Sequence, residues 1–261
     1  MLDAMVMLLG LLLALLGFAP APDPALEEAW EEWKSFYAKE YPREAEATRR
    51  EVWEKNLRRI QQHNWEQSQG QHAFRLAMNH YGDLTDEEFN QLLNRFIPAE
   101  REGLVQLFQA SAARKTPAEV DWRAKGYVTP VKNQDTSSCR YNPQDRAANC
   151  STIWMVDQGS EAALEQAVAA VGPVSVAVDA SSFQFHFYKS GIFSSVFCSQ
   201  WVNHGMLAVG YGMSQEHGHN VSYWILKNSW SEVWGEQGYI RLLKDGGNQC
   251  RVASQASFPM L

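Results

Sequence analysis

The spacing of apolar residues changes near Pro117, and this change sets the fold class. Before it, apolar side chains recur every three or four positions over residues 25–37 and 43–64, which predicts two amphipathic helices. After it, one further helix is predicted over residues 160–171. The runs that predict strands are residues 174–178, 206–211, 223–227 and 238–242. Helices in the N-terminal part and strands in the C-terminal part indicate an α+β arrangement.

Two local signals divide the helical part further. Gly70 ends the second helix, and residues 73–78 predict a short strand. Thr85 and Glu88 form a capping box just ahead of Phe89, because each side chain can bind the exposed backbone N–H of the other residue. We therefore predict that a third helix begins there.

The chain divides into three segments. Residues 5–18 are apolar and uncharged but fall short of the roughly 20 residues of a membrane-spanning helix, so residues 1–20 predict a secretory signal peptide. A short membrane anchor is the less favoured alternative. Residues 99–117 carry no periodicity and include an Arg-Lys pair, which predicts an exposed, cleavable connector. The boundary between residues 21–115 and residues 116–261 lies within this connector.

Composition excludes several classes of protein. With 30 acidic and 23 basic residues, the net charge of −7 argues against nucleic-acid binding, which needs clustered Lys and Arg. The 45% hydrophobic and 20% charged content is typical of a globular chain with a core.

His217 and His219 resemble a metal pair, but no third ligand lies nearby in the sequence, so a surface loop is favoured. We expect no cofactor, no metal, no nucleic-acid partner and no membrane span.

The cysteines are interpreted in an oxidising compartment, where cysteines normally pair. Spacing alone leaves all three pairings open among Cys139, Cys150, Cys198 and Cys250. Two Asn-x-Ser sequons begin at Asn149 and Asn220 and are candidate glycan sites.

Several ordered motifs resemble one family. The residues Glu46, Arg50, Trp53, Asn56, Ile60 and Asn64 match the helix signature of papain-family prosegments, and residues 77–83 match the second prosegment signature. Residues 120–134 resemble the start of a mature cathepsin L. The chain is thus similar to a cathepsin L-like cysteine peptidase precursor, which implies an inhibitory prosegment over residues 21–115 and a papain-like peptidase domain over residues 116–261.

The resemblance also assigns roles to residues. Asn203-His204-Gly205 and Lys227-Asn-Ser-Trp230 resemble the segments that carry the family's histidine and asparagine. By position, His204 would be the general acid/base, Asn228 would orient its ring, Trp230 would shield that contact, and Gln134 would donate to the oxyanion. The substrates implied are peptides or proteins, and the location implied is lysosomal or secreted.

The family's nucleophile is missing from its expected place. The family has Cys-Gly-Ser-Cys-Trp a few residues after Gln134, but residues 135–143 read Asp-Thr-Ser-Ser-Cys-Arg-Tyr-Asn-Pro. The family spaces nucleophile and histidine by about 130 residues or more, whereas a nucleophile six positions after Gln134 would lie only 64 before His204. About 70 residues are missing by that arithmetic. We therefore predict a catalytically inactive, truncated peptidase domain that retains mainly the β-barrel half.

Cys139 is the alternative nucleophile, and it would give a weakly active thiol peptidase. Residues 138–143 instead resemble a downstream family segment whose cysteine is a structural half-cystine. A reactive thiolate also needs a helix terminus beside it, and Asn142-Pro143 stops a helix at this point. A further alternative is a prosegment-type inhibitor or decoy of active cathepsins, since the prosegment signatures are complete.

Other details follow from the resemblance. Cys198 and Cys250 match a bonded pair of the family, which leaves Cys139 and Cys150 over. Ser231 and Arg251 stand where the family usually has glycine, so a positive φ at either position would add strain of about 1 kcal/mol or more. Gln255 lies near the floor of the family's main specificity pocket, so substrate preference cannot be transferred to this chain.

Overall fold

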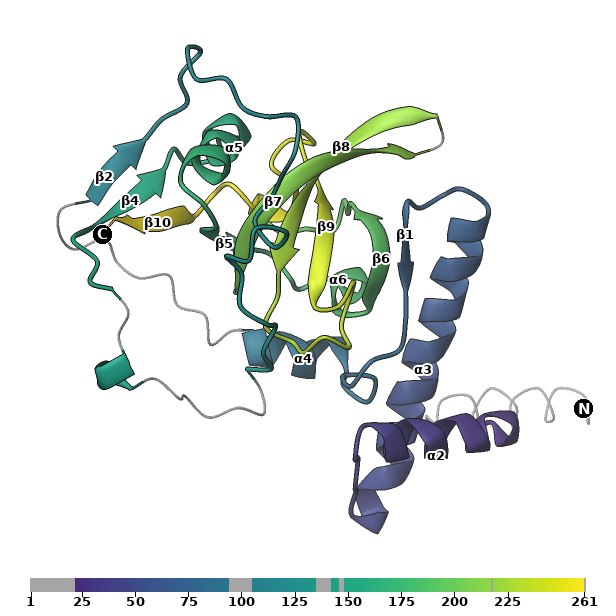
Figure 1. The fold of residues 1–261 in the computed structure, drawn as a ribbon. Coiled ribbons are helices and arrows are strands. Elements are labelled where there is room, and N and C mark those ends of the chain that lie inside the picture. The colour runs from purple at the N-terminus through teal and green to yellow at the C-terminus, as the bar shows by residue number, and fades with distance from the viewer. Residues whose placement is uncertain (1–21, 94–104, 135–141, 146–147, 217, 261) are drawn as a thin grey trace, which may run out of the picture.

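The computed structural model describes residues 22–93, 105–134, 142–145, 148–216 and 218–260 (Figure 1). The predicted signal peptide, Cys139 and His217 lie outside these residues. No helix in the described part of the chain is both long and apolar enough to cross a membrane.

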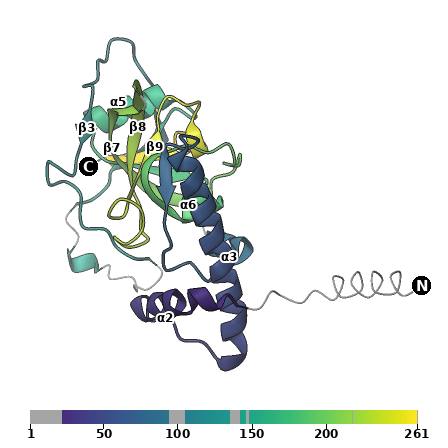
Figure 2. The ribbon, with the colours of Figure 1, turned by 90° about the vertical axis from the view of Figure 1, so that its right-hand side faces the viewer.

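The N-terminal part is helical, as the periodicity predicts. A short 3-10 turn, η1 (Pro24–Leu26), leads into α2 (Glu27–Phe36), and α2 crosses the long helix α3 (Arg43–Ser68) near its lower end (Figure 1). Turning the molecule by 90° shows that this crossing lies away from the sheet (Figure 2). At the crossing, Trp30 stacks on Trp33 at a centroid distance of 5.4 Å and contacts Trp53 edge-on at 5.5 Å. The three indoles form a small core of their own.

Helix ends follow the local signals. The helix α3 ends just before Gly70, whose φ of +81° suits glycine. The strand β1 (Phe74–Leu76) follows. The capping box is confirmed, because Thr85 N–H donates to Glu88 Oε2 (3.0 Å) and Glu88 N–H donates to Thr85 Oγ1 (3.1 Å). The helix α4 (Asp86–Leu93) begins there.

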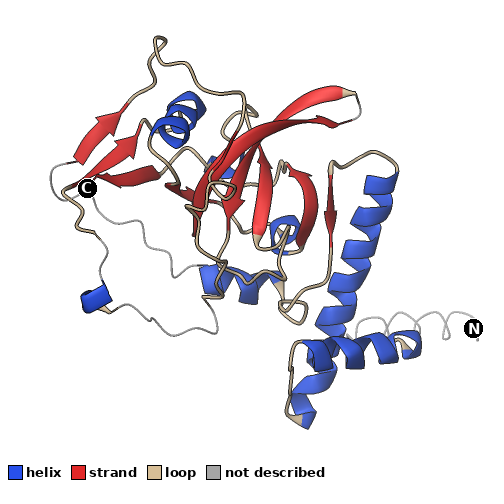
Figure 3. Cartoon of the chain, in the orientation of Figure 1, coloured by secondary structure: helices blue, strands red, loops and turns tan. Residues whose placement is uncertain are grey.

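The C-terminal part is mostly a strongly bent sheet, and the helices lie around it (Figure 3). Its strands are β3 (Val120–Asp121), β4 (Thr152–Val156), β5 (Val174–Val178), β6 (Tyr188–Phe193), β7 (His204–Glu216), β8 (His219–Lys227), β9 (Tyr239–Leu243) and β10 (Ala256–Met260). The helical elements are η2 (Pro143–Asp145), α5 (Glu161–Ala170), α6 (Phe183–His186) and η3 (Gln249–Arg251). The α+β class is therefore confirmed.

Both ends of the sheet are strands that precede Pro117. The order is β1-β6-β9-β8-β7-β5-β10-β4-β2, with β3 paired to β7. At one end, β1 pairs antiparallel with β6, and at the other, β2 (Val105–Phe108) pairs parallel with β4. Gly191 permits the first pairing, because a Cβ there would lie 2.3 Å from the Ala73 carbonyl oxygen. The N-terminal part thus supplies both edge strands.

The prediction of an exposed connector over residues 99–117 was wrong in part, because Phe108 is buried. Residues 105–108 form β2, since their backbone groups add to the free edge of β4. Residues 109–115 are exposed as expected, yet Ser111 exchanges two hydrogen bonds with the Gln166 side chain on α5 (2.9 and 3.0 Å). A four-residue strand that relies on a distant partner leaves little signal of its own in the sequence.

The hydrophobic core is continuous across the two parts. Phe74 of β1 lies 4.8 Å from Phe193 of β6, and Phe89 of α4 lies 5.3 Å from Trp230, measured between ring centroids. All four rings are nearly fully buried. The helical part is therefore packed as part of the core of the sheet.

The structure bears out one cysteine pairing. Cys198 and Cys250 form a disulfide. Cys150 is exposed and unbonded, and its thiol donates to the Thr152 carbonyl oxygen (2.9 Å). The state of Cys139 lies outside the described residues.

The two non-glycine positions have the backbone conformation that was expected to cause strain. Ser231 has a φ of +68° and Arg251 a φ of +66°. Both are in the left-handed region, which costs an L-residue with a Cβ about 1 kcal/mol or more.

Replacing Ser231 with glycine should stabilise the protein. We expect Ser231→Gly to raise the free energy of unfolding by roughly 0.5 to 1 kcal/mol, since relief of strain exceeds glycine's entropic cost at positive φ. Urea unfolding measures the change, with Ser229→Gly as the control. A lower unfolding midpoint for Ser231→Gly would contradict this prediction.

Candidate active site

A buried histidine and asparagine face each other where the central strands β7 and β8 begin and end. His204 is the first residue of β7, and Asn228 follows the last residue of β8. His204 Nε2 lies 2.8 Å from Asn228 Oδ1, and the two residues are 4% and 3% exposed. The pair forms because β7 and β8 are hydrogen-bonded neighbours, which brings together residues 24 positions apart.

The hydrogen bonds fix the roles of the atoms in this pair. The Ser229 backbone N–H also donates to Asn228 Oδ1 (2.7 Å), so this atom is an acceptor. His204 Nε2 must therefore carry a proton, and Nδ1 is the nitrogen that can exchange a proton with a reacting group. An asparagine carbonyl that holds an imidazole in one tautomer is an arrangement that suits general acid/base chemistry.

Trp230 covers the pair. Its ring centroid lies 4.5 Å from that of His204, and the residue is 1% exposed. Phe185 and Trp234 contact the same indole at 5.9 and 5.3 Å, so its position is fixed by packing. The indole keeps water from the hydrogen bond between His204 and Asn228.

Gln134 is held beside the pair by its backbone. Its N–H donates to the Ser229 carbonyl oxygen (2.9 Å), and Ser229 Oγ donates to Gln134 Oε1 (2.6 Å). Because Oε1 is an acceptor, the Nε2 amide is the donor end of this exposed side chain. Donation to an oxyanion is what the resemblance implies for Gln134.

A cavity of about 650 Å³ joins these residues to the helical part. Gln134 and His204 line one side, whereas Tyr81, Leu84 and Leu93 line the other. Tyr81 also contacts Trp230 at 5.7 Å between ring centroids. The N-terminal part therefore lies over the candidate site.

The structure brings together all four residues that the sequence singled out around His204. Their catalytic roles remain predictions. The contact between His186 and Phe89 was not anticipated, although their ring centroids are 3.4 Å apart. An isolated histidine in a short helix gives no sequence signal for such a contact.

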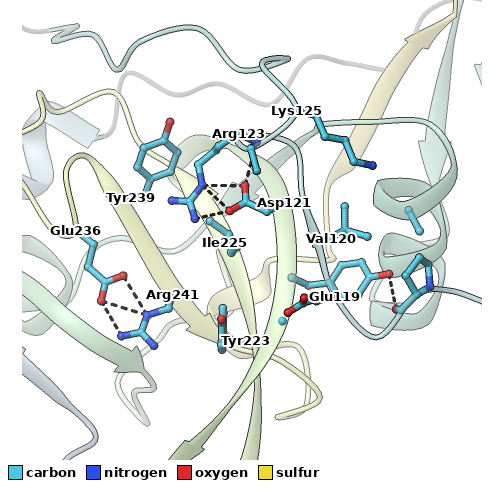
Figure 4. Close-up of a pocket in the computed structure, with 15 residues that line it drawn as sticks. Glu119, Val120, Asp121, Arg123, Lys125, Tyr223, Ile225, Glu236, Tyr239 and Arg241 are labelled. Carbon is cyan, nitrogen blue, oxygen red and sulfur yellow. Dashed lines mark hydrogen bonds and ion pairs between the residues drawn. The ribbon is translucent and has the colours of Figure 1, made fainter.

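A second hollow, of about 500 Å³, shares no lining residue with the first (Figure 4). Figure 4 shows two ion pairs that line it, one between Arg123 and Asp121 and one between Arg241 and Glu236. Because each guanidinium already has a carboxylate partner, this hollow does not offer an unpaired charge from these arginines to a ligand.

Burial of His186 should make stability depend on pH. Burial lowers the pKa of His186 to about 3 from a usual value of 6.5. Between about pH 6.5 and about pH 3 the unfolded chain binds the proton more tightly, so stability is full above this window and is lost as pH falls. Acidification to about pH 4.5 should cost roughly 2 to 3 kcal/mol through this group.

The measurement is the free energy of unfolding against pH in His186→Leu and in the unmodified chain. In His186→Leu, the slope of the unfolding free energy against pH should fall across this window by the amount that corresponds to one proton. His219→Leu, at an exposed position, is the control and should keep the slope. Equal slopes for His186→Leu and the unmodified chain would refute the expectation.

Comparison with known proteins agrees with the fold. Residues 135–260 match the papain family cysteine protease model, and residues 30–89 match the cathepsin propeptide inhibitor domain (I29). The chain is 36% identical to procathepsin L of Felis catus over 98% of each sequence. It is 35% identical to cathepsin L2 of Homo sapiens, over 92% of this chain and 94% of that one. The chain belongs to the papain family of cysteine peptidases and is cathepsin L-like.

A solved structure has the same architecture. Digestive procathepsin L 3 from the larval midgut of Tenebrio molitor superposes with a TM-score of 0.79 at 27% identity, covering 92% of this chain and all of that one. The alignment with the cat protein extends over 330 positions, 69 more than the 261 residues here. At least 69 aligned positions are therefore gaps in this chain, which is truncated relative to its relatives. The family's chemistry indicates protein substrates.

Proposed function

We propose that this chain is a cathepsin L-like precursor that does not cleave peptides. The observation that carries the proposal is the spacing between Gln134 and His204, which leaves no room for the family's nucleophile segment and central helix. His204 and Asn228 keep the geometry of an acid/base pair, but such a pair needs a thiolate to activate.

The cysteines of the described part support this proposal. Cys198 and Cys250 are bonded to each other, and the Cys150 thiol is exposed and turned to the Thr152 carbonyl. None of the three has the features of an activated thiolate, which are a neighbouring imidazole and a helix N-terminus. Cys139 is the remaining candidate, and the experiment below tests it directly.

The test is turnover of fluorogenic dipeptide substrates by the purified chain, before and after cleavage of the 109–115 segment. We expect no turnover that a thiol alkylator abolishes. Alkylator-sensitive turnover would overturn the proposal. If that turnover were lost in Cys139→Ser and in His204→Ala, the chain would be a weakly active thiol peptidase that uses Cys139.

A second function, inhibition of active cathepsins, is favoured by the integrity of the prosegment. Asn56 donates to the carbonyl oxygens of Gly82 and Leu84 (2.9 and 3.0 Å), and Arg49 forms two bonds of 2.8 Å with Glu88. These contacts hold α4 against α3. The I29 model covers the same residues.

Inhibition is tested with the separate segment of residues 22–115 and an active cathepsin L. Block of turnover at micromolar or lower concentration would support this function, and no effect at that concentration would remove it. A segment carrying Trp53→Ala, which disrupts the indole core, is the control and should inhibit less.

The chain is further proposed to pass through the secretory pathway to a lysosomal or secreted location. Both sequon residues, Asn149 and Asn220, are exposed in the structure, so a transferase could reach them. We expect the expressed protein to shift in mass on treatment with an N-glycosidase. Loss of the shift in Asn149→Gln with Asn220→Gln would confirm the sites, and an unglycosylated cytosolic product would contradict this route.

A further inference from the structure

Three metal-binding side chains meet at the end of α3, away from the candidate active site. His63 and Glu66 lie one turn apart on the helix, and His72 lies in the turn before β1. One ligand atom from each residue lies within 4.8 Å of the others. His72 Nε2 is 3.0 Å from Glu66 Oε2, and the two imidazole rings stack at 4.2 Å.

The backbone around this group is held in place. Asn64 donates to the Leu76 carbonyl oxygen (2.8 Å) and accepts from the Leu76 N–H (2.9 Å), which ties α3 to β1. Buried His63 has Nε2 at 3.1 Å from the Phe74 carbonyl oxygen. A carbonyl only accepts, so the proton of the neutral imidazole is on Nε2 and the lone pair is on Nδ1. Metal-binding histidines are commonly oriented by such a bond to a carbonyl.

We propose that His63, Glu66 and His72 form a binding site for Zn²⁺. Two imidazoles and one carboxylate are a ligand set that zinc accepts with water as the fourth ligand, whereas Ca²⁺ and Mg²⁺ prefer oxygen ligands alone. Zinc ligands at about 2.0 to 2.2 Å from the ion are about 3.3 Å apart in a tetrahedron. The ligand atoms here lie within 4.8 Å of one another, and rotation of the partly exposed Glu66 and His72 side chains can bring them to the shorter spacing.

The position of the site gives the ion a structural role. It would join the last turns of α3 to the segment that leads into β1, and β1 is the strand that pairs with β6. Because the ion binds the folded arrangement, zinc should stabilise the whole chain and not only the turn.

The test is the thermal unfolding of the full chain with ZnCl₂ and with EDTA, after alkylation of free thiols so that cysteine cannot bind the ion. We expect zinc to raise the unfolding midpoint and Co²⁺ to give visible absorption bands. His72→Ala removes a direct ligand, so it should weaken zinc binding by more than the roughly tenfold that the loss of an outer-sphere partner costs. Glu66→Gln should weaken it as well.

His219→Ala is the matched control, since this exposed histidine lies on the β7–β8 hairpin away from α3. It should keep the full zinc response. The midpoints in EDTA show whether each variant folds. An absent zinc response in the unmodified chain would overturn the site, as would an equal response in folded His72→Ala, or a response lost only in His219→Ala.

Discussion

Residues 116–261 expressed alone should show no cooperative unfolding transition. Without the preceding residues, β6 and β4 lose their outer partners β1 and β2, and both become open sheet edges. The buried rings of Phe193 and Trp230 also lose their contacts with Phe74 and Phe89. Such a fragment should aggregate or remain unfolded, as seen by thermal circular dichroism and size-exclusion chromatography.

Coexpression provides the control for this result. Residues 22–115 and 116–261 produced together should assemble into a folded complex, since the contacts between them are restored. A fragment of residues 116–261 that unfolds cooperatively near the midpoint of the whole chain would show that the N-terminal part is dispensable for the fold.

Trp53→Ala should destabilise the protein by roughly 3 to 5 kcal/mol, the usual cost of deleting a buried aromatic side chain. Trp53 is 2% exposed and contacts both Trp30 and Trp33 at the crossing of α2 and α3. Trp65→Ala on the same helix is the matched control. Its side chain is 58% exposed, so the change should stay within about 0.5 kcal/mol.

A second substitution separates packing from hydrogen bonding at this position. Trp53 Nε1 is buried, and no hydrogen-bond partner for it is seen in the described structure. Trp53→Phe should therefore lower the free energy of unfolding by much less than Trp53→Ala does. It keeps an aromatic ring and removes a desolvated N–H. Urea unfolding gives all three values, and equal losses for Trp53→Ala and Trp65→Ala would disprove the role of the indole core.

The elements that could be predicted from the sequence are those specified by nearby residues. The long helix α3 has its own apolar spacing, and the capping box at Thr85 and Glu88 specifies the start of α4. The proximity of His204 and Asn228 was anticipated from a family resemblance, and it follows physically from two adjacent antiparallel strands.

The elements that escaped prediction depend on distant partners. The strand β6 contains Gly191 at a φ of +98°, which breaks the usual pattern of a strand and suits only the close approach of β1. The strand β4 lies between β10 and β2, so it is stabilised by pairing with distant strands. The residues of β4 and the spacing of its apolar positions did not predict this pairing. The contact of His186 with Phe89 also joins residues almost 100 positions apart.

The placement of β1 and β2 at opposite margins has a consequence for the order of assembly. During synthesis, β1 and β2 leave the ribosome before β4 and β6 have been made. The two strands can therefore pair only after their partners are synthesised. For β1 the partner lies up to 117 positions further along the chain, as between Phe74 and Gly191. Closing such long loops is entropically costly and slows folding. The indole core between α2 and α3 gives the N-terminal part local structure before these partners are synthesised. The later strands can then complete the sheet between β1 and β2.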